Sequence, residues 1–149
     1  MARCKLWVTN RTGQTMSALV VWHTPSMPQP QDVMPDRAVI NVTDIANERG
    51  AQVEIEVPTS PFDFWFLGCR FEGDSATYAM SNMADMPFKE FAVSDGDLID
   101  FVIGKAGLPG QYPVDVKHNG DYSATAKVEN VKQILVLELV GALLASFGA

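Results

Sequence analysis

The chain has 149 residues, of which 47% are hydrophobic, and this is enough for one ordinary domain with a substantial core. Its formal net charge of −7 and its 11 scattered basic residues argue against nucleic acid as a partner, because phosphate binding needs a stripe or patch of positive charge. The first ten residues contain no apolar run of the secretory kind, so we expect a cytoplasmic protein, with non-classical release left open.

Apolar residues alternate with polar ones along much of the chain, and turn residues interrupt the alternation at short intervals. This pattern is typical of all-β proteins and predicts a two-sheet antiparallel β-sandwich of about eight to ten strands. We expect residues 1–140 to form this single domain and residues 141–149 to form a hydrophobic tail. The predicted strands are 4–10, 15–23, 38–43, 51–57, 62–71, 76–80, 89–93, 98–104, 113–118, 122–128 and 131–140.

Two connections carry hairpin signals. Residues 11–14 join the first two predicted strands, and Gly13 can take a positive φ there at little steric cost, so these strands are predicted to pair as a hairpin. Asn119-Gly120 is a strong signal for a tight hairpin turn later in the chain.

Residues 24–37 are the one conspicuous irregular segment, with four prolines that disfavour strand pairing. We interpret this segment as a surface loop. It is either a recognition loop at one end of the sandwich or a stiff crossover between the two sheets.

The densest aromatic stretch, residues 62–71, is apolar on both faces of its predicted strand. Trp65 lies on one face, together with Leu67, Cys69 and Phe71, and three phenylalanines lie on the other. A central strand packed on both sides fits this pattern, and so does a strand that presents an aromatic row to a lipid, glycan or protein. Asp63 belongs to the Trp65 face and must find hydrogen-bond donors if that face is dry.

No motif indicates catalysis, a metal or a cofactor. The two histidines, His23 and His118, and the two cysteines, Cys4 and Cys69, lack the spacing of a metal site, so the cysteines are interpreted as small buried residues, with a bridge between them as the alternative. The acidic turn 95–100 lacks the spacing of an EF-hand. We therefore expect a protein that is not an enzyme, although a histidine paired in space with Cys69 or a serine stays open as a hydrolase alternative.

Residues 134–149 are apolar apart from Glu138 and Ser146. Sixteen residues fall short of the roughly 20 needed for a membrane-spanning helix. An exposed apolar segment of this kind indicates an interface, so this segment is where a homo-oligomer would form.

Several stretches together resemble a known family of small β-sandwich domains. They are V-T-N-R-T-G-Q-T (8–15), the strand ending in Trp22-His23, D-F-W-F (63–66) with the following Glu72-Gly73-Asp74 turn and Tyr78, and F-K-E-F (88–91). They resemble a nematode longevity-associated family and its fungal and bacterial relatives and, more loosely, aegerolysins and actinoporin-like proteins. The resemblance spans about residues 5–128 and implies a lipid or surface binder that uses Trp22, Trp65 and Tyr78.

These observations lead to one main functional hypothesis, a non-catalytic protein that recognises a membrane lipid or a protein surface through aromatic residues and end loops. Its predicted binding residues are Trp22, His23, Asp63, Trp65 and Tyr78. The alternatives are a structural subunit that assembles through its C-terminal tail and edge strands, and the hydrolase described above.

Overall fold

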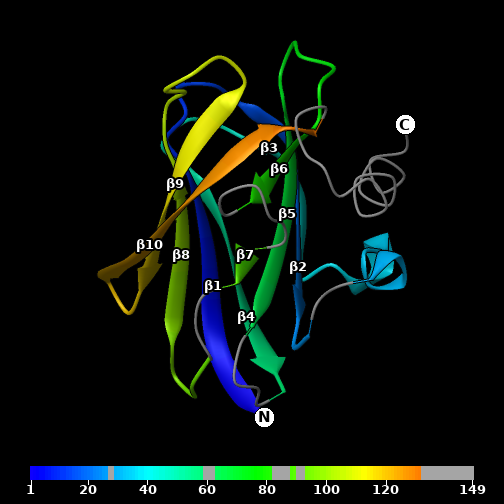
Figure 1. Cartoon of the computed structure of the whole chain (residues 1–149), viewed down its shortest axis with the longest axis vertical. Helices are drawn as coiled ribbons and strands as arrows, with labels where there is room; N and C mark the ends of the chain where they lie inside the picture. The colour runs from blue at the N-terminus through cyan, green and yellow to red at the C-terminus, as the bar shows by residue number, and fades with distance from the viewer. Residues whose placement is uncertain (27–28, 59–62, 82–87, 90–92, 132–149) are drawn as a thin grey trace.

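The structure, a computed structural model, describes residues 1–26, 29–58, 63–81, 88–89 and 93–131 (Figure 1). In these ranges the chain forms ten strands and two short 3-10 turns. They are β1 (Ala2–Asn10), β2 (Met16–Thr24), η1 (Pro30–Asp32), η2 (Pro35–Arg37), β3 (Ile40–Ile45), β4 (Gly50–Val57), β5 (Phe64–Phe71), β6 (Tyr78–Ser81), β7 (Phe88–Lys89), β8 (Leu98–Ile103), β9 (Gln111–His118) and β10 (Asp121–Asn130). The all-β prediction is confirmed.

Nine of these strands form one continuous hydrogen-bonded path in the order β3-β2-β5-β6-β10-β9-β8-β1-β4, and β7 pairs with β5 beside it. The sheet curls until its two end strands, β3 and β4, face each other, so it is nearly closed into a barrel. The β1–β8 pair is parallel and the other pairs are antiparallel. A two-sheet antiparallel sandwich is therefore not confirmed, because alternation along single strands does not reveal how the strands are ordered.

The predicted hairpin between the first two strands is wrong. β1 pairs with β4 and β8, whereas β2 pairs with β3 and β5. The connection after Asn10 instead carries the chain from one wall of the nearly closed barrel to the other, past the gap between β3 and β4. The Asn-Gly hairpin is confirmed, because β9 and β10 pair directly and both Asn119 (φ 55°) and Gly120 (φ 87°) have the positive φ of a tight turn.

The main core fills the inside of the barrel. Alternate residues of the strands point inward, as the half-buried pattern of β4 and the alternating pattern of β9 show, in line with the alternation seen along much of the sequence. On β5, Trp65, Leu67, Cys69 and Phe71 belong to this core, as expected for one face of that strand. Cys4 and Cys69 are buried free thiols, so no bridge joins them.

The opposite face of β5 is covered as well. Phe66 lies there beside Trp22 of β2, with ring centroids 5.7 Å apart, and both side chains are buried. The proline segment between β2 and β3 packs against this pair, because the Trp22 indole N–H donates to the Met34 carbonyl at 2.8 Å and Val33 is buried. The segment therefore covers the outside of the barrel between two neighbouring strands, which explains why the aromatic strand is apolar on both faces.

The predicted strand 131–140 and the tail 141–149 lie outside the described residues, as does most of the predicted strand 89–93.

Candidate functional site

The structure brings together three of the five predicted binding residues at one end of the barrel interior. Asp63 precedes β5 and is almost fully buried, and its carboxyl oxygens accept from His23 Nε2 at 2.5 Å and from the Val93 backbone N–H at 2.6 Å. The His23 ring lies edge-on to Trp65, with centroids 4.6 Å apart. These two donors are the partners that the buried position of Asp63 requires.

Trp22 and Tyr78 lie elsewhere. Trp22 is on the outer face of β2, under the proline segment. Tyr78 packs against Phe71 and Tyr112 inside the barrel and donates its hydroxyl to Asp74 at 2.7 Å. Trp22, Trp65 and Tyr78 are 1%, 0% and 6% exposed, so none of the three offers its ring to the surface.

A second histidine–aspartate pair lies where β8 begins and β9 ends. His118, at the end of β9, contacts Asp97 through Nε2 at 2.7 Å, and Asp97 also accepts from the Asn119 amide and the Ser94 N–H. Burial alone would raise the pKa of Asp97, but these hydrogen bonds hold it below the ordinary value. The pair joins the turn before β8 to the β9–β10 turn, which is a structural role.

The two cysteine thiols are not suited to nucleophilic catalysis. Burial, with the charges of Asp97 and Asp63, raises the pKa of Cys4 to about 11, and burial raises the pKa of Cys69 to about 12. Both thiols are therefore protonated at neutral pH, whereas a catalytic cysteine needs the thiolate. In the described ranges, no three His, Cys, Asp or Glu side chains form a group that could hold a metal ion.

The buried His23 predicts a specific pH dependence. Burial lowers its pKa below the ordinary 6.5, against the opposing influence of Asp63. As the pH falls below 6.5, His23 becomes protonated in the unfolded chain but not in the folded protein. The free energy of unfolding should therefore decrease by at most about 1.4 kcal/mol per pH unit until the folded-state pKa is reached. Urea unfolding at several pH values between 7 and 5 measures this slope.

The control for this pH effect is His23→Gln, which keeps an N–H donor for Asp63 but does not titrate. The slope between pH 6.5 and 5 should be shallower in this variant than in the parent protein. Equal slopes in the two proteins would show that His23 is not the titrating group.

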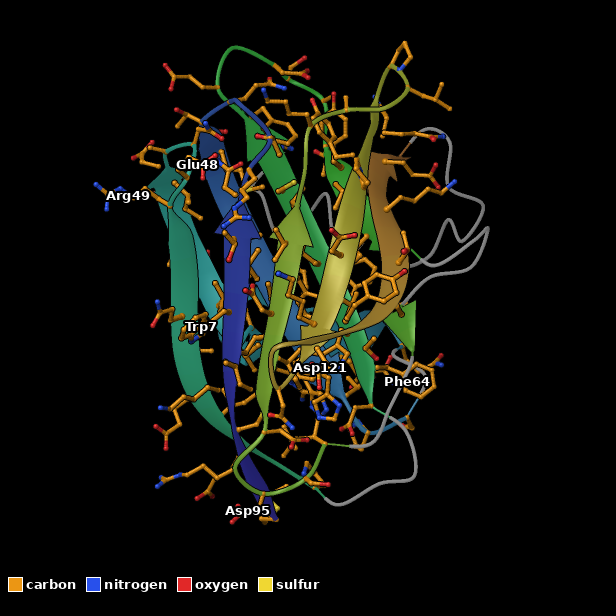
Figure 2. The ribbon with its side chains drawn as sticks, turned by 90° about the vertical axis from the view of Figure 1, so that its left-hand side faces the viewer. Trp7, Glu48, Arg49, Phe64, Asp95 and Asp121 are labelled. Atoms are coloured by element: carbon orange, nitrogen blue, oxygen red, sulfur yellow. The ribbon has the colours of Figure 1, made fainter. Side chains whose placement is uncertain are left out.

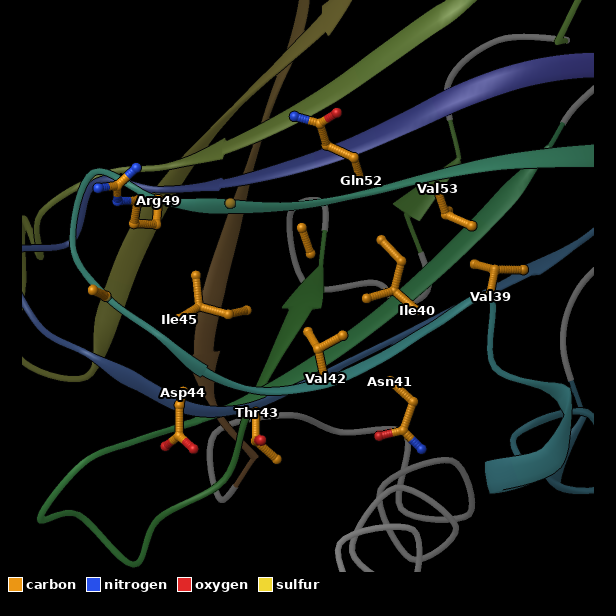
Figure 3. Close-up of a pocket in the computed structure, with 13 residues that line it drawn as sticks. Val39, Ile40, Asn41, Val42, Thr43, Asp44, Ile45, Arg49, Gln52 and Val53 are labelled. Atoms are coloured by element: carbon orange, nitrogen blue, oxygen red, sulfur yellow. The ribbon is translucent and has the colours of Figure 1, made fainter.

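A groove lies between the two end strands of the sheet, and we call this groove the seam (Figure 3). β3 and β4 are not hydrogen bonded to each other, and the groove between them has a volume of about 490 Å³. Residues 39–46 and 49–53 line it. Because each end strand is paired on one side only, alternate N–H and C=O groups along its other side point toward the groove.

Apolar side chains of the barrel interior reach the surface at the seam. Figure 3 shows Ile40, Val42 and Val53 pointing into the groove, whereas Asn41 and Asp44 point away from it. Val42 faces inward opposite the buried Leu19, yet it is 37% exposed. Val39, Ala51, Val53 and Ile55 are only partly buried, although they pack against the core.

One end of the seam is closed by two loops that Asn10 holds together. The buried Asn10 amide donates to the carbonyls of Gln14 and Ile45, and its oxygen accepts from the Thr12 N–H and hydroxyl. The Asn10 backbone also bonds to Glu48 and Arg49 in the β3–β4 connection. Glu48 and Arg49 lie at this end of the barrel, and Asp95 lies at the other (Figure 2).

No protein-family model matches the sequence, and no curated protein aligns with it significantly. The resemblance to the longevity-associated family stays a prediction. None of the described helical segments is long and apolar enough to cross a membrane.

The seam was not predicted from the sequence. Strands were predicted at 38–43 and 51–57, close to the observed β3 and β4, but the seam depends on the absence of a pairing between them. Alternation within each strand carries no signal for this missing pairing, because it reports only which face of the strand is buried.

Proposed function

We propose that this chain is a non-catalytic binding protein that recognises a protein surface by accepting an extended polypeptide segment at the seam. The observation that carries the proposal is the juxtaposition of two unpaired strand edges with an apolar groove between them. An extended peptide added to an exposed sheet edge gains backbone hydrogen bonds, and side-chain pockets select its sequence.

The seam offers both kinds of contact. Away from the β3–β4 connection, a guest strand would pair with β3 on one side and β4 on the other, and it would extend the hydrogen bonding of the barrel there. Its inward side chains would cover Val42 and Val53, which are incompletely buried in the free protein. We therefore expect preference for segments with apolar residues at alternate positions.

The lipid version of the hypothesis has less support, since Trp22, Trp65 and Tyr78 are buried and lie on different faces of the sheet. The cysteine form of the hydrolase alternative is disfavoured by the protonated thiol of Cys69.

The test uses a seven-residue peptide of alternating valine and threonine as a generic guest strand. On titration, the backbone N–H groups of β3 and β4 that face the groove should become protected from hydrogen exchange, and NMR shifts should concentrate in residues 39–45 and 50–55. The protection follows from new backbone hydrogen bonds, so it is independent of the peptide's exact sequence.

The matched control is the same peptide with alternate backbone nitrogens methylated, which keeps the side chains but removes donors. It should bind at least about tenfold more weakly, because several backbone hydrogen bonds are lost. Equal binding of the two peptides, or shifts confined to other strands, would contradict recognition at the seam.

A further inference from the structure

The geometry points to the guest strand itself: we infer that the seam accepts residues 134–140 of a second copy of this chain, which makes the protein self-assembling. This inference rests on the proposed function and names its partner. It concerns an apolar run, I-L-V-L-E-L-V, that follows the last described strand.

The alternation of this run matches the two sides of the seam. In a strand, Leu135, Leu137 and Leu139 share one face, and the single charge of the run, Glu138, lies on the other. With the leucines directed into the groove, Glu138 faces solvent, on the side where the exposed Glu54 and Glu56 of β4 also lie. The opposite register would bury Glu138 in an apolar groove without a partner, which is costly.

The topology favours a second copy over the same chain. β10, which precedes residue 131, stands fifth of nine in the sheet order, with four strands on each side, so it is the strand farthest from the seam. Figure 2 shows β4 at one side of the barrel and β10 at the other. A nine-stranded barrel is about 18 Å across, whereas the three residues from Val131 to Ile134 reach at most about 11 Å. The run therefore cannot begin at its own seam.

The charges of residues 132–149 are compatible with insertion of residues 134–140 into the seam of a second copy. Lys132 and Glu138 are the only charged residues in 132–149 and cancel, so the remaining residues carry the whole net charge of −7. The segment 132–149 as a whole has no net charge, so it is repelled by an acidic second copy less than an acidic segment would be. An acidic guest peptide would not have this advantage.

The decisive experiment separates the donor segment from the acceptor groove in the full chain. Val42→Asp places a charge in the groove and blocks the acceptor, and Leu137→Asp blocks the donor. The parent protein should assemble in a concentration-dependent way in analytical ultracentrifugation, and each variant alone should associate at least about tenfold more weakly, because a carboxylate would enter the apolar contact.

Mixing the two variants should restore association, but only as a one-to-one dimer. The Val42→Asp chain still carries an intact donor segment, and the Leu137→Asp chain still carries an intact groove. The controls are Asn41→Asp and Val136→Asp, which add the same charge on the opposite face of each strand and should assemble almost like the parent protein.

A second acceptor variant, Val53→Asp on the other wall of the groove, replaces Val42→Asp if the latter fails to fold by circular dichroism. A monomeric parent protein would overturn the inference, and so would assembly that survives both acceptor variants. If the valine–threonine peptide nevertheless protects β3 and β4, recognition of strands at the seam stands and only the identity of the partner is wrong. If neither peptide binding nor assembly is seen, both proposals fail.

Discussion

Replacement of Asp63 by alanine is expected to lower the free energy of unfolding by about 3 kcal/mol, because it removes the acceptor for two buried donors. His23 Nε2 and the Val93 N–H both point at this carboxyl group, and the His23 side chain is only 4% exposed. Neither donor can be hydrated without opening the end of the barrel. Chemical denaturation of the two proteins at pH 7 measures the loss.

The comparison variant is Asp63→Asn, which keeps the shape and one acceptor oxygen. It should lose less than the alanine variant, about 1 to 2 kcal/mol, because its amide nitrogen can accept from neither donor. Hydrogen exchange of the Val93 amide should accelerate in both variants. If the two substitutions cost the same small amount, below about 0.5 kcal/mol, Asp63 would be solvated rather than anchored by these partners.

Much of this anchoring was predictable from the sequence, since an aspartate on the apolar face of a strand requires donors wherever that face is buried. The identity of the donors was not predictable. His23 lies at the end of β2, opposite Trp65 in the strand pairing, and Val93 comes from a segment 30 residues away. Only the three-dimensional pairing of strands determines which polar groups meet.

The same limit explains why the seam could not be predicted from the sequence. Individual strands follow from alternation and turn residues, and β5 was correctly assigned two apolar faces. The order of strands follows from contacts between distant segments, and the parallel β1–β8 pairing has no local signal in the sequence. The turn at Gly13 suggested a hairpin because a positive φ (here 85°) suits such turns, yet the same glycine serves a longer connection that leads across the end of the barrel.

Asn10→Ala is the second substitution with a large expected effect, also about 3 kcal/mol, since four hydrogen bonds of one buried side chain are lost. The Ile45 carbonyl and the Thr12 N–H would be left without their partner. Because Ile45 ends β3, the effect should extend to the seam, and the Glu48 and Arg49 amides in the β3–β4 connection should exchange faster. Denaturation and hydrogen exchange by mass spectrometry test the two parts separately.

Two further variants show which part of the side chain matters. Asn10→Asp keeps the acceptor oxygen but turns a second oxygen toward the Gln14 and Ile45 carbonyls, so it should be as damaging as alanine. Asn47→Ala removes an exposed side chain whose oxygen accepts from Gly13, in the same pair of loops, and should cost less than about 1 kcal/mol.

A guest peptide should still bind the Asn47 variant with parent affinity, whereas binding to the Asn10 variants should weaken, because the two edges of the seam are no longer held at a fixed separation. Unchanged peptide binding after loss of Asn10 would show that the spacing of β3 and β4 is set elsewhere in the barrel.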